Sequence, residues 1–312
     1  MSFSLRTKNE LARIYGRPCC LKAELAALVK TGGRLAGRNG HPGLVIGTES
    51  AAVARKAFKL LKDAGRFAGE MTVRKNTRLS RNGYIITVEG EKGMLSVLRE
   101  LGYLDRAGRV KGGIKKALVG RDCCRRAYLR GAFLARGSLS GPGTAYHLEI
   151  PVRGERDGSD LVSLMEKLGV EGKMGHRKGA PVVYIKESEQ ISRCLNVMGA
   201  HTTLLHFENI RIYKEMRNRV NRLVNCDTAN VNKAVDAGVR QYENVKLVVE
   251  ALGLTNLPLP LREIARLRLA HPDASLRELG ELAQPPLTKS CVNHRMRRLE
   301  ALAQALRVGR QG

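Results

Sequence analysis

Small and apolar residues recur at helical spacing along residues 20–32 (CLKAELAALVKTG), and this segment ends at a glycine pair, a common way to stop a helix. Apolar runs near Leu35 and over residues 44–48 predict two strands after it. The pattern then predicts a helix over 51–64, strands over 71–77 and 84–89, and a helix over 92–101. The order αββαββα indicates an α+β domain.

The same course of elements recurs at a constant offset of 104 residues, which pairs Cys19-Cys20 with Cys123-Cys124 and Gly33 with Gly137. Self-similarity at a fixed offset indicates a duplication. The later copy predicts a helix over 124–136, strands near 147–152 and over 182–186, and helices over 161–168 and 191–198. We therefore expect one duplicated domain over residues 1–205, with repeats at about 19–102 and 123–199.

The chain changes character from about residue 210, where arginine and asparagine become frequent. We expect helices on either side of Cys226-Asp227, the later one capped by Asp227 or Thr228. Asparagine and proline cluster at residues 256–260 and predict a boundary there. The expected organisation is a helical linker over 206–256 and a separate all-α domain over 257–312.

The last domain carries the pattern of two helices joined by a tight turn. Ser275, followed three residues later by a glutamate, has the form of a capping box for a helix over 276–283. Pro285 and Pro286 then require a turn, because the second proline cannot continue a helix. A further helix is predicted to begin near Lys289.

That further helix is amphipathic. One face carries the apolar residues Val292, Met296, Leu299 and Leu302. The polar residues opposite are Ser290, Asn293, His294 and Arg297, and the flanking cations are Lys289, Arg295 and Arg298. This arrangement predicts a helix-turn-helix, because a helix in the major groove must offer donors to base edges and cations to phosphates.

Each polar residue of this helix has an expected role in DNA binding. We expect Arg297 to contact guanine and Asn293 to contact adenine. The three flanking cations are expected to bind phosphates, while Ser290 and His294 suit either role. The alternative is a helical bundle with a solvated basic face, since amphipathic helices joined by tight turns are common.

Composition favours a polyanionic partner. Lysine and arginine total 55 against 29 aspartate and glutamate residues, which gives a formal net charge of +26. The alternatives are a charge excess that only aids solubility and an anionic membrane surface, but no long basic amphipathic segment or lipidation signal supports membrane attachment. No run approaches the roughly 18 apolar residues of a membrane span, and seven cysteines do not form a secreted disulfide pattern. We expect a cytoplasmic, nucleoid-associated protein with reduced thiols and no membrane partner.

Residues 25–33 (LAALVKTGG) and 129–137 (LRGAFLARG) resemble the motif of LAGLIDADG homing endonucleases, which implies two motif helices packed at a pseudo-two-fold axis. In that family the motif ends in a metal-binding aspartate and a glycine. Gly32 and Arg136 stand at the aspartate positions here, although such a nuclease needs hard oxygen ligands for its metal. Glu24 lies about 12 Å along the helix from Gly32, too far to substitute. We expect no catalytic residues, metal or cofactor.

Over most of its length the chain resembles the WhiA-type bacterial regulators, which join a degenerate LAGLIDADG domain to a C-terminal helix-turn-helix. The resemblance lies in RPCCLKAELAAL with its repeat DCCRRAYLRGAFLARGSLS, in NRLVNCDTANVNKAV, and in ASLRELGELAQPPLTKSCVNHRMRRLEALA. It implies a transcriptional regulator of cell division, chromosome segregation and, in spore-forming lineages, sporulation. The implied partners are double-stranded promoter DNA and, beyond it, other regulators or RNA polymerase.

Other readings stay open beside this one. A nucleoid-associated or RNA-binding structural protein needs only the positive charge, although 4% aromatic residues give little base-stacking surface. An active homing endonuclease ranks last. The pairs Cys19-Cys20 and Cys123-Cys124 suggest zinc, but adjacent residues point about 100° apart on a helix, which favours buried thiols. Cys226 and Cys291 are also expected to be core thiols.

Overall fold

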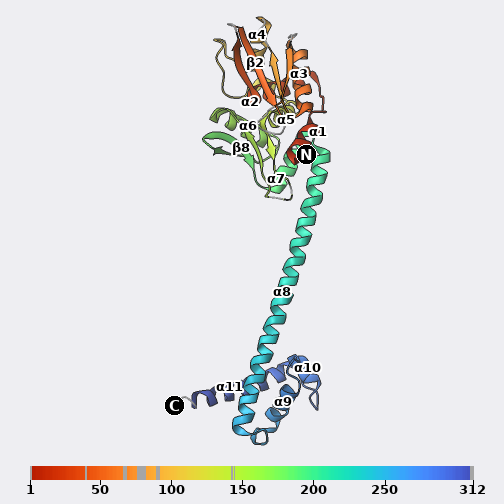
Figure 1. The fold of residues 1–312 in the computed structure, drawn as a ribbon, viewed down its shortest axis with the longest axis vertical. Coiled ribbons are helices and arrows are strands. Elements are labelled where there is room, and N and C mark those ends of the chain that lie inside the picture. Colours follow the sequence, from red (N-terminus) through yellow and green to blue (C-terminus); the bar gives the residue numbers. More distant parts are fainter. Residues whose placement is uncertain are drawn as a thin grey trace. The chain divides into compact units, whose positions relative to one another are not determined.

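The computed structural model describes residues 2–38, 41–65, 69–75, 82–88, 92–141, 143 and 145–309. The chain divides into two compact units, an N-terminal unit at Met1–Lys214 and a C-terminal unit at Glu215–Gly312. Figure 1 shows the order of their elements. None of the helices in the described parts is long and apolar enough to cross a membrane.

The first repeat has the predicted order αββαββα. Its elements are α2 (Pro18–Gly32), β1 (Gly33–Arg38), β2 (His41–Thr48), α3 (Ala51–Gly65), β3 (Gly69–Lys75), β4 (Asn82–Val88) and α4 (Lys92–Glu100). The strands form an antiparallel sheet in the order β1-β2-β4-β3. The pattern did not predict the preceding helix α1 (Phe3–Leu11), whose N-cap is Ser2. Residues 38–43 (RNGHPG) have a sequence typical of a short turn, and residues 39 and 40 of this segment lie outside the described residues.

The second repeat has the same topology. A short 3₁₀ helix, η1 (Lys116–Leu118), precedes α5 (Asp122–Arg136), β5 (Ser138–Leu139), β6 (Leu148–Pro151), α6 (Glu155–Glu166), β7 (Lys173–Arg177), β8 (Ala180–Ile185) and α7 (Ser188–Met198). The sheet order is β5-β6-β8-β7. Strand β7 was not predicted, because its residues KMGHR do not alternate between apolar and polar. Helix α6 begins six residues before the predicted Leu161, with Glu155 and Asp157 in its first turn.

Helices α2 and α5 pack side by side in the core that both repeats share. A Cβ atom on Gly131 would lie 2.3 Å from the carbonyl oxygen of Glu24 and 2.9 Å from the Cβ of Ala27. Real side chains do not approach a backbone this closely, so the spacing requires glycine at this position. The side-by-side packing of two motif helices, which the LAGLIDADG resemblance implies, is therefore confirmed.

Helix α8 (His201–Leu252) corrects the prediction of two helices around Cys226-Asp227. These residues lie in the interior of one continuous helix, so neither Asp227 nor Thr228 is an N-cap. Asparagine, aspartate and threonine favour caps in short peptides, but each costs less than about 1 kcal/mol in a helix interior. Cys226 is exposed, so the prediction of a core thiol was wrong there, and Cys291 is only partly buried.

The C-terminal unit contains a short 3₁₀ helix, η2 (Leu254–Asn256), and the helices α9 (Leu259–Ala270), α10 (Leu276–Glu281) and α11 (Lys289–Gly309). Its hydrophobic core includes Val245 and Val248 from the end of α8 together with Ile264, Leu279 and Leu299. Helix α10 ends two residues before the predicted Ala283, and residues 284–288 form the turn that the prolines required.

Candidate nucleic-acid interface and the motif-helix ends

One face of α11 is buried against the rest of the C-terminal unit. Val292 and Leu299 are fully buried and Met296 is 3% exposed, as the apolar pattern predicted. Leu302, the fourth predicted position, is only partly buried, and Ala303 takes its place in the core. The buried face fixes which side chains of the helix meet solvent.

The opposite face of α11 presents the polar residues singled out from the sequence. Lys289, Ser290, His294, Arg297 and Arg298 are exposed. Asn293 is half-buried at the edge of this face. We call these six residues the outer face of α11. A surface with donors at its centre and cations around it suits a negatively charged groove.

Arg295 differs from the other basic residues of α11, because it is held inside the unit. Its guanidinium lies 3.1 Å from the carboxylate of Glu263 on α9 and donates to the carbonyl oxygen of Pro260 at 3.4 Å. The carboxylate of Glu263 also accepts the backbone N–H of Gln284 at 3.1 Å. Glu263 therefore ties both the turn and α11 to α9.

The N-terminus of α10 is fixed by the capping box that the sequence predicted. The hydroxyl of Ser275 accepts the backbone N–H of Glu278 at 3.3 Å, and the carboxylate of Glu278 accepts the N–H of Ser275 at 2.7 Å. These bonds from Ser275 lower the pKa of the Glu278 carboxyl. The box sets where α10 begins, and thereby where the turn falls.

The turn after α10 depends on a glycine. The N–H of Leu287 donates to the carbonyl oxygen of Gly280 at 2.8 Å. A Cβ on Gly280 would lie 2.3 Å from the carbonyl oxygen of Leu287, so the chain can close back on α10 only at a glycine. The sequence pattern does not predict a special role for this residue. Its signal is a glycine near the end of a short helix, five residues before a proline pair.

A buried arginine anchors α9 within the C-terminal unit. Arg268 is 1% exposed and donates to the carbonyl oxygens of Pro272 and Ala274 at 3.1 and 2.6 Å. It also donates to the side chain of Gln241 on α8 at 2.8 Å. Burial lowers the pKa of this guanidinium. The local sequence does not indicate this role, because a basic residue in an arginine-rich chain is expected on the surface.

The ends of the two motif helices carry no acid. Gly32 is the last residue of α2, where an added Cβ would lie 3.1 Å from the Cβ of Ala135. Arg136 is the last residue of α5 and is exposed. Within the described residues, the one group with the spacing of metal ligands consists of four cysteines elsewhere in the unit. Gly32 and Arg136 therefore provide none of the oxygen ligands that Mg²⁺ requires.

Glu24 is a buried structural acid. It is fully buried in α2, with its carboxylate 2.5 Å from the ammonium of Lys56 and 3.2 Å from the guanidinium of Arg130 on α5. The ammonium of Lys56 also donates to the carbonyl oxygens of Leu11 and Ile14. Burial lowers the pKa of Lys56, and the nearby Glu24 carboxylate opposes this shift. Two cations thus occupy both oxygens of the only acid in α2.

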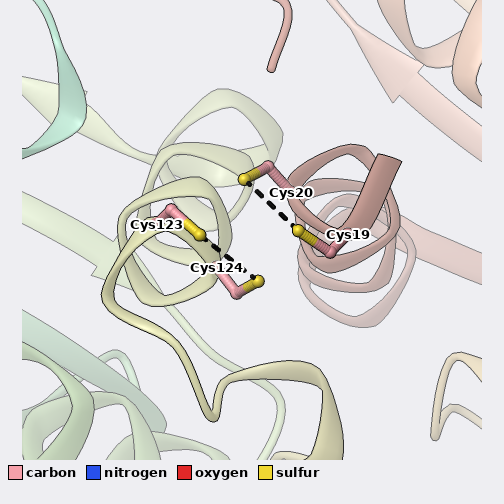
Figure 2. A group of neighbouring side chains, drawn as sticks. All are labelled: Cys19, Cys20, Cys123 and Cys124. Atoms are coloured by element: carbon pink, nitrogen blue, oxygen red, sulfur yellow. Dashed lines mark hydrogen bonds between the residues drawn. The ribbon is translucent and has the colours of Figure 1, made fainter. Parts of the chain in front are cut away.

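The two cysteine pairs meet between α2 and α5 (Figure 2). The Sγ atoms of Cys19 and Cys20 are 4.0 Å apart, those of Cys123 and Cys124 are 3.9 Å apart, and all four lie within 4.8 Å of one another. Cys20 and Cys124 are buried, whereas Cys19 and Cys123 are partly exposed. The sequence placed each pair at a helix start without predicting that the pairs converge.

The four thiols differ in acidity. Burial raises the pKa of Cys20 to about 11 and that of Cys124 to about 12. The hydrogen bond from Cys124 lowers the pKa of Cys19, and the guanidinium of Arg121 lowers it further. Cys19 is therefore the thiol that ionises more readily than these two.

Comparison with known proteins accounts for the whole chain. Three family models match in succession: the WhiA N-terminal LAGLIDADG-like domain over residues 18–104, the WhiA LAGLIDADG-like domain over 125–217 and the WhiA C-terminal HTH domain over 220–303. A protein of Desulforudis audaxviator named "Probable cell division protein WhiA" is 55% identical to this chain and covers 99% of both. The chain belongs to the WhiA family.

Other WhiA proteins show the same extent of similarity. Those of Desulforamulus reducens and Heliobacterium modesticaldum are 51% and 50% identical, and the matches cover 100% of this chain and 98% of each relative. Among solved structures, full-length WhiA from Thermatoga maritima matches 98% of this chain and 99% of its own, with a TM-score of 0.58 and 26% identity.

The WhiA comparison confirms the fold derived from the sequence. A crystal structure of the N-terminal LAGLIDADG domain of WhiA matches 64% of this chain with a TM-score of 0.50. The duplicated unit is thus a LAGLIDADG fold, and the C-terminal helices form an HTH domain. In this WhiA chain the motif helices end in Gly32 and Arg136 where the nuclease motif has acids.

Proposed function

We propose that this WhiA-family chain is a sequence-specific DNA-binding transcriptional regulator that reads the major groove with α11. The observation that carries the proposal is the outer face of α11, which combines exposed hydrogen-bonding and basic side chains on a helix anchored by its buried face. A net charge of +26 on the whole chain supplies long-range attraction to the phosphate backbone. The relatives are named probable cell division proteins, which supports cell division as the process that the regulated genes serve.

The residues of the outer face divide the work of binding. Arg297 is exposed and has the geometry for a bidentate contact with guanine, and the half-buried Asn293 is the residue we assign to adenine. Lys289 and Arg298 bind phosphates, and Ser290 and His294 complete the contacts. Because its guanidinium is already bound to Glu263, Arg295 acts mainly by positioning α11 and meets a phosphate only at the edge of the interface.

The N-terminal unit acts without cleaving DNA. Its motif-helix ends lack carboxylates, and its buried acid Glu24 is paired with Lys56 and Arg130. We propose that this unit positions the HTH domain or contacts other regulators or RNA polymerase at promoters. The processes controlled are cell division and chromosome segregation and, in spore-forming lineages, sporulation. Incubation of the protein with supercoiled plasmid and Mg²⁺ should leave the plasmid intact.

The decisive experiment selects bound duplexes from a random DNA pool at about 0.15 M salt, where non-specific phosphate binding is already weakened. We expect an enriched sequence motif. No enrichment, with unchanged affinity for every duplex, would instead identify a general nucleoid or RNA-binding protein.

Variants of α11 then assign the contacts. Arg297→Ala should weaken binding to the selected site by about 1–3 kcal/mol and relax sequence preference at one position. Arg297→Lys keeps the charge but loses the bidentate geometry, so it should also lose preference. Arg298→Ala is the matched control, because it should weaken selected and random DNA alike. Equal losses on both kinds of DNA for Arg297→Ala would remove Arg297 from the base contacts.

A further inference from the structure

The cysteine cluster (Cys19, Cys20, Cys123 and Cys124) is the part of the molecule that the proposed function leaves unused. Two residues come from each repeat, at positions related by the offset of 104 residues. Figure 2 shows their sulfur atoms converging in the space between the starts of α2 and α5. Buried cysteines that serve only as small apolar residues have no need to bring four sulfur atoms together.

The spacing of the sulfur atoms fits one metal ion. Zinc bound by four thiolates has Zn–S distances of about 2.3 Å, so its sulfur atoms stand about 3.8 Å apart at the corners of a tetrahedron. The pairs within each helix already lie at 4.0 and 3.9 Å, and no pair exceeds 4.8 Å. A multinuclear iron–sulfur cluster would hold its outer thiolates further apart than a single ion does.

Adjacent cysteines can share one metal ion here because the two pairs lie on two helices that face one another. Side chains of neighbouring residues do point about 100° apart on one helix. Here, however, two helices face one another, and each contributes two sulfur atoms that form one edge of the tetrahedron. The edges come from different helices, so neither pair needs to enclose the ion alone.

The groups around the four cysteines favour the negative charge that a metal–thiolate centre carries. Four thiolates around Zn²⁺ carry a net charge of −2, and the cysteines occupy the first turns of α2 and α5, where the helix dipole is positive. Arg17 and Arg121 stand at the N-cap positions of these two helices. The two helix N-termini and the nearby guanidinium of Arg121 thus offset this negative charge.

We propose that Cys19, Cys20, Cys123 and Cys124 bind one zinc ion, which joins the two LAGLIDADG-like repeats at the starts of their motif helices. Four protein ligands leave no open position for water or substrate, so the ion is structural. The site is also remote from the lost nuclease centre, because Cys19 and Gly32 lie about 20 Å apart along α2. The proposal is independent of the DNA-binding function of the C-terminal unit.

The test measures metal in the full chain, purified with a thiol reductant and without chelator. We expect one zinc per chain by elemental analysis. Replacement by Co²⁺ should give the visible absorption of a tetrahedral cobalt–thiolate centre. The double variant Cys20→Ser/Cys124→Ser should lose both the zinc and the cobalt absorption, whereas Cys226→Ser, which changes an exposed cysteine on α8, should keep both.

Three outcomes would overturn the proposal of a structural zinc ion. Wild-type chain with neither zinc nor cobalt absorption would overturn it. A disulfide between the two helices that persists under these reducing conditions would also overturn it and identify a redox pair instead. If the double variant fails to fold, chelator treatment of the wild type decides: removal of the metal should lower the midpoint of thermal unfolding, and an unchanged midpoint would exclude a structural ion.

Discussion

The motif helices α2 and α5 are two copies of one element with different buried charges. Both contain 15 residues, both carry a cysteine pair in the first turn, and both are followed by a glycine, Gly33 or Gly137. Yet the buried acid Glu24 in α2 corresponds to Tyr128 in α5, and the buried Lys30 corresponds to Leu134. The backbone of the duplication has been kept while its buried charges have diverged.

The partners of these charges explain the divergence. The ammonium of Lys30 donates to the carbonyl oxygen of Lys111 at 2.5 Å and lies 3.5 Å from the carboxylate of Asp157 on α6. Lys111 belongs to the segment that connects the repeats, which exists only once in the chain. A buried charge survives only where a partner compensates it, so a single connecting segment permits it in one copy alone.

The largest loss of stability is expected when the buried acid Glu24, which has no counterpart in α5, is removed. Glu24→Ala leaves the ammonium of Lys56 and the guanidinium of Arg130 buried without a counter-charge, so the N-terminal unit should lose about 3–5 kcal/mol of unfolding free energy. Chemical denaturation followed by circular dichroism measures the loss. Tyr128→Phe at the equivalent position removes a hydroxyl but no charge, and should cost about 1 kcal/mol or less. Equal losses for the two variants would show that the buried charges do not distinguish the copies.

The next largest loss of stability is expected at Gly131, where α5 packs closely against α2. Gly131→Ala places a methyl group 2.3 Å from the carbonyl oxygen of Glu24 and should cost about 1–3 kcal/mol by forcing α2 and α5 apart. Ala27→Gly, the exchange at the equivalent residue of α2, creates no clash and should cost about 1 kcal/mol through helix propensity. The two unfolding midpoints, measured side by side, sharpen the comparison. A more stable Gly131→Ala variant would contradict the close packing.

The smallest effect is expected at the end of α5, where the side chain meets solvent. Arg136→Ala removes a favourable charge from a helix C-terminus and should cost no more than about 1 kcal/mol. Gly137→Ala, one residue later, should cost more, because its Cβ would lie 2.7 Å from the Cα of Phe133. Thermal melts of both variants test this order. A large loss for Arg136→Ala would reveal a contact that its exposure does not suggest.

The sequence predicted the features that depend on local pattern. The repeat order, the capping box at Ser275 and the buried positions Val292, Met296 and Leu299 all follow from periodicity or from residues a few positions apart. These signals act within one or two helical turns, so the chain displays them directly.

Features that depend on distant partners escaped prediction. The burial of Arg268 requires acceptors from Gln241 and the loop after α9, and that of Glu24 requires cations from α3 and α5. The meeting of the cysteine pairs depends on how two helices are placed against one another. In helix α8 a local signal was misleading. Asp227 is a residue type that favours helix N-caps, yet it lies in the interior of one continuous helix of 52 residues.

The anchoring of Arg268 also bears on how such a protein can be taken apart and recombined. Its bond to Gln241, together with the bond of Arg307 to buried Asn244 at 2.8 Å, places part of the foundation of the HTH domain inside α8. A gene fusion joined after residue 256 would transplant α9, α10 and α11 without Gln241, Asn244, Val245 and Val248. A transplant that keeps its shape must carry the last turns of α8 with it, so the join in a chimaeric regulator belongs before Gln241.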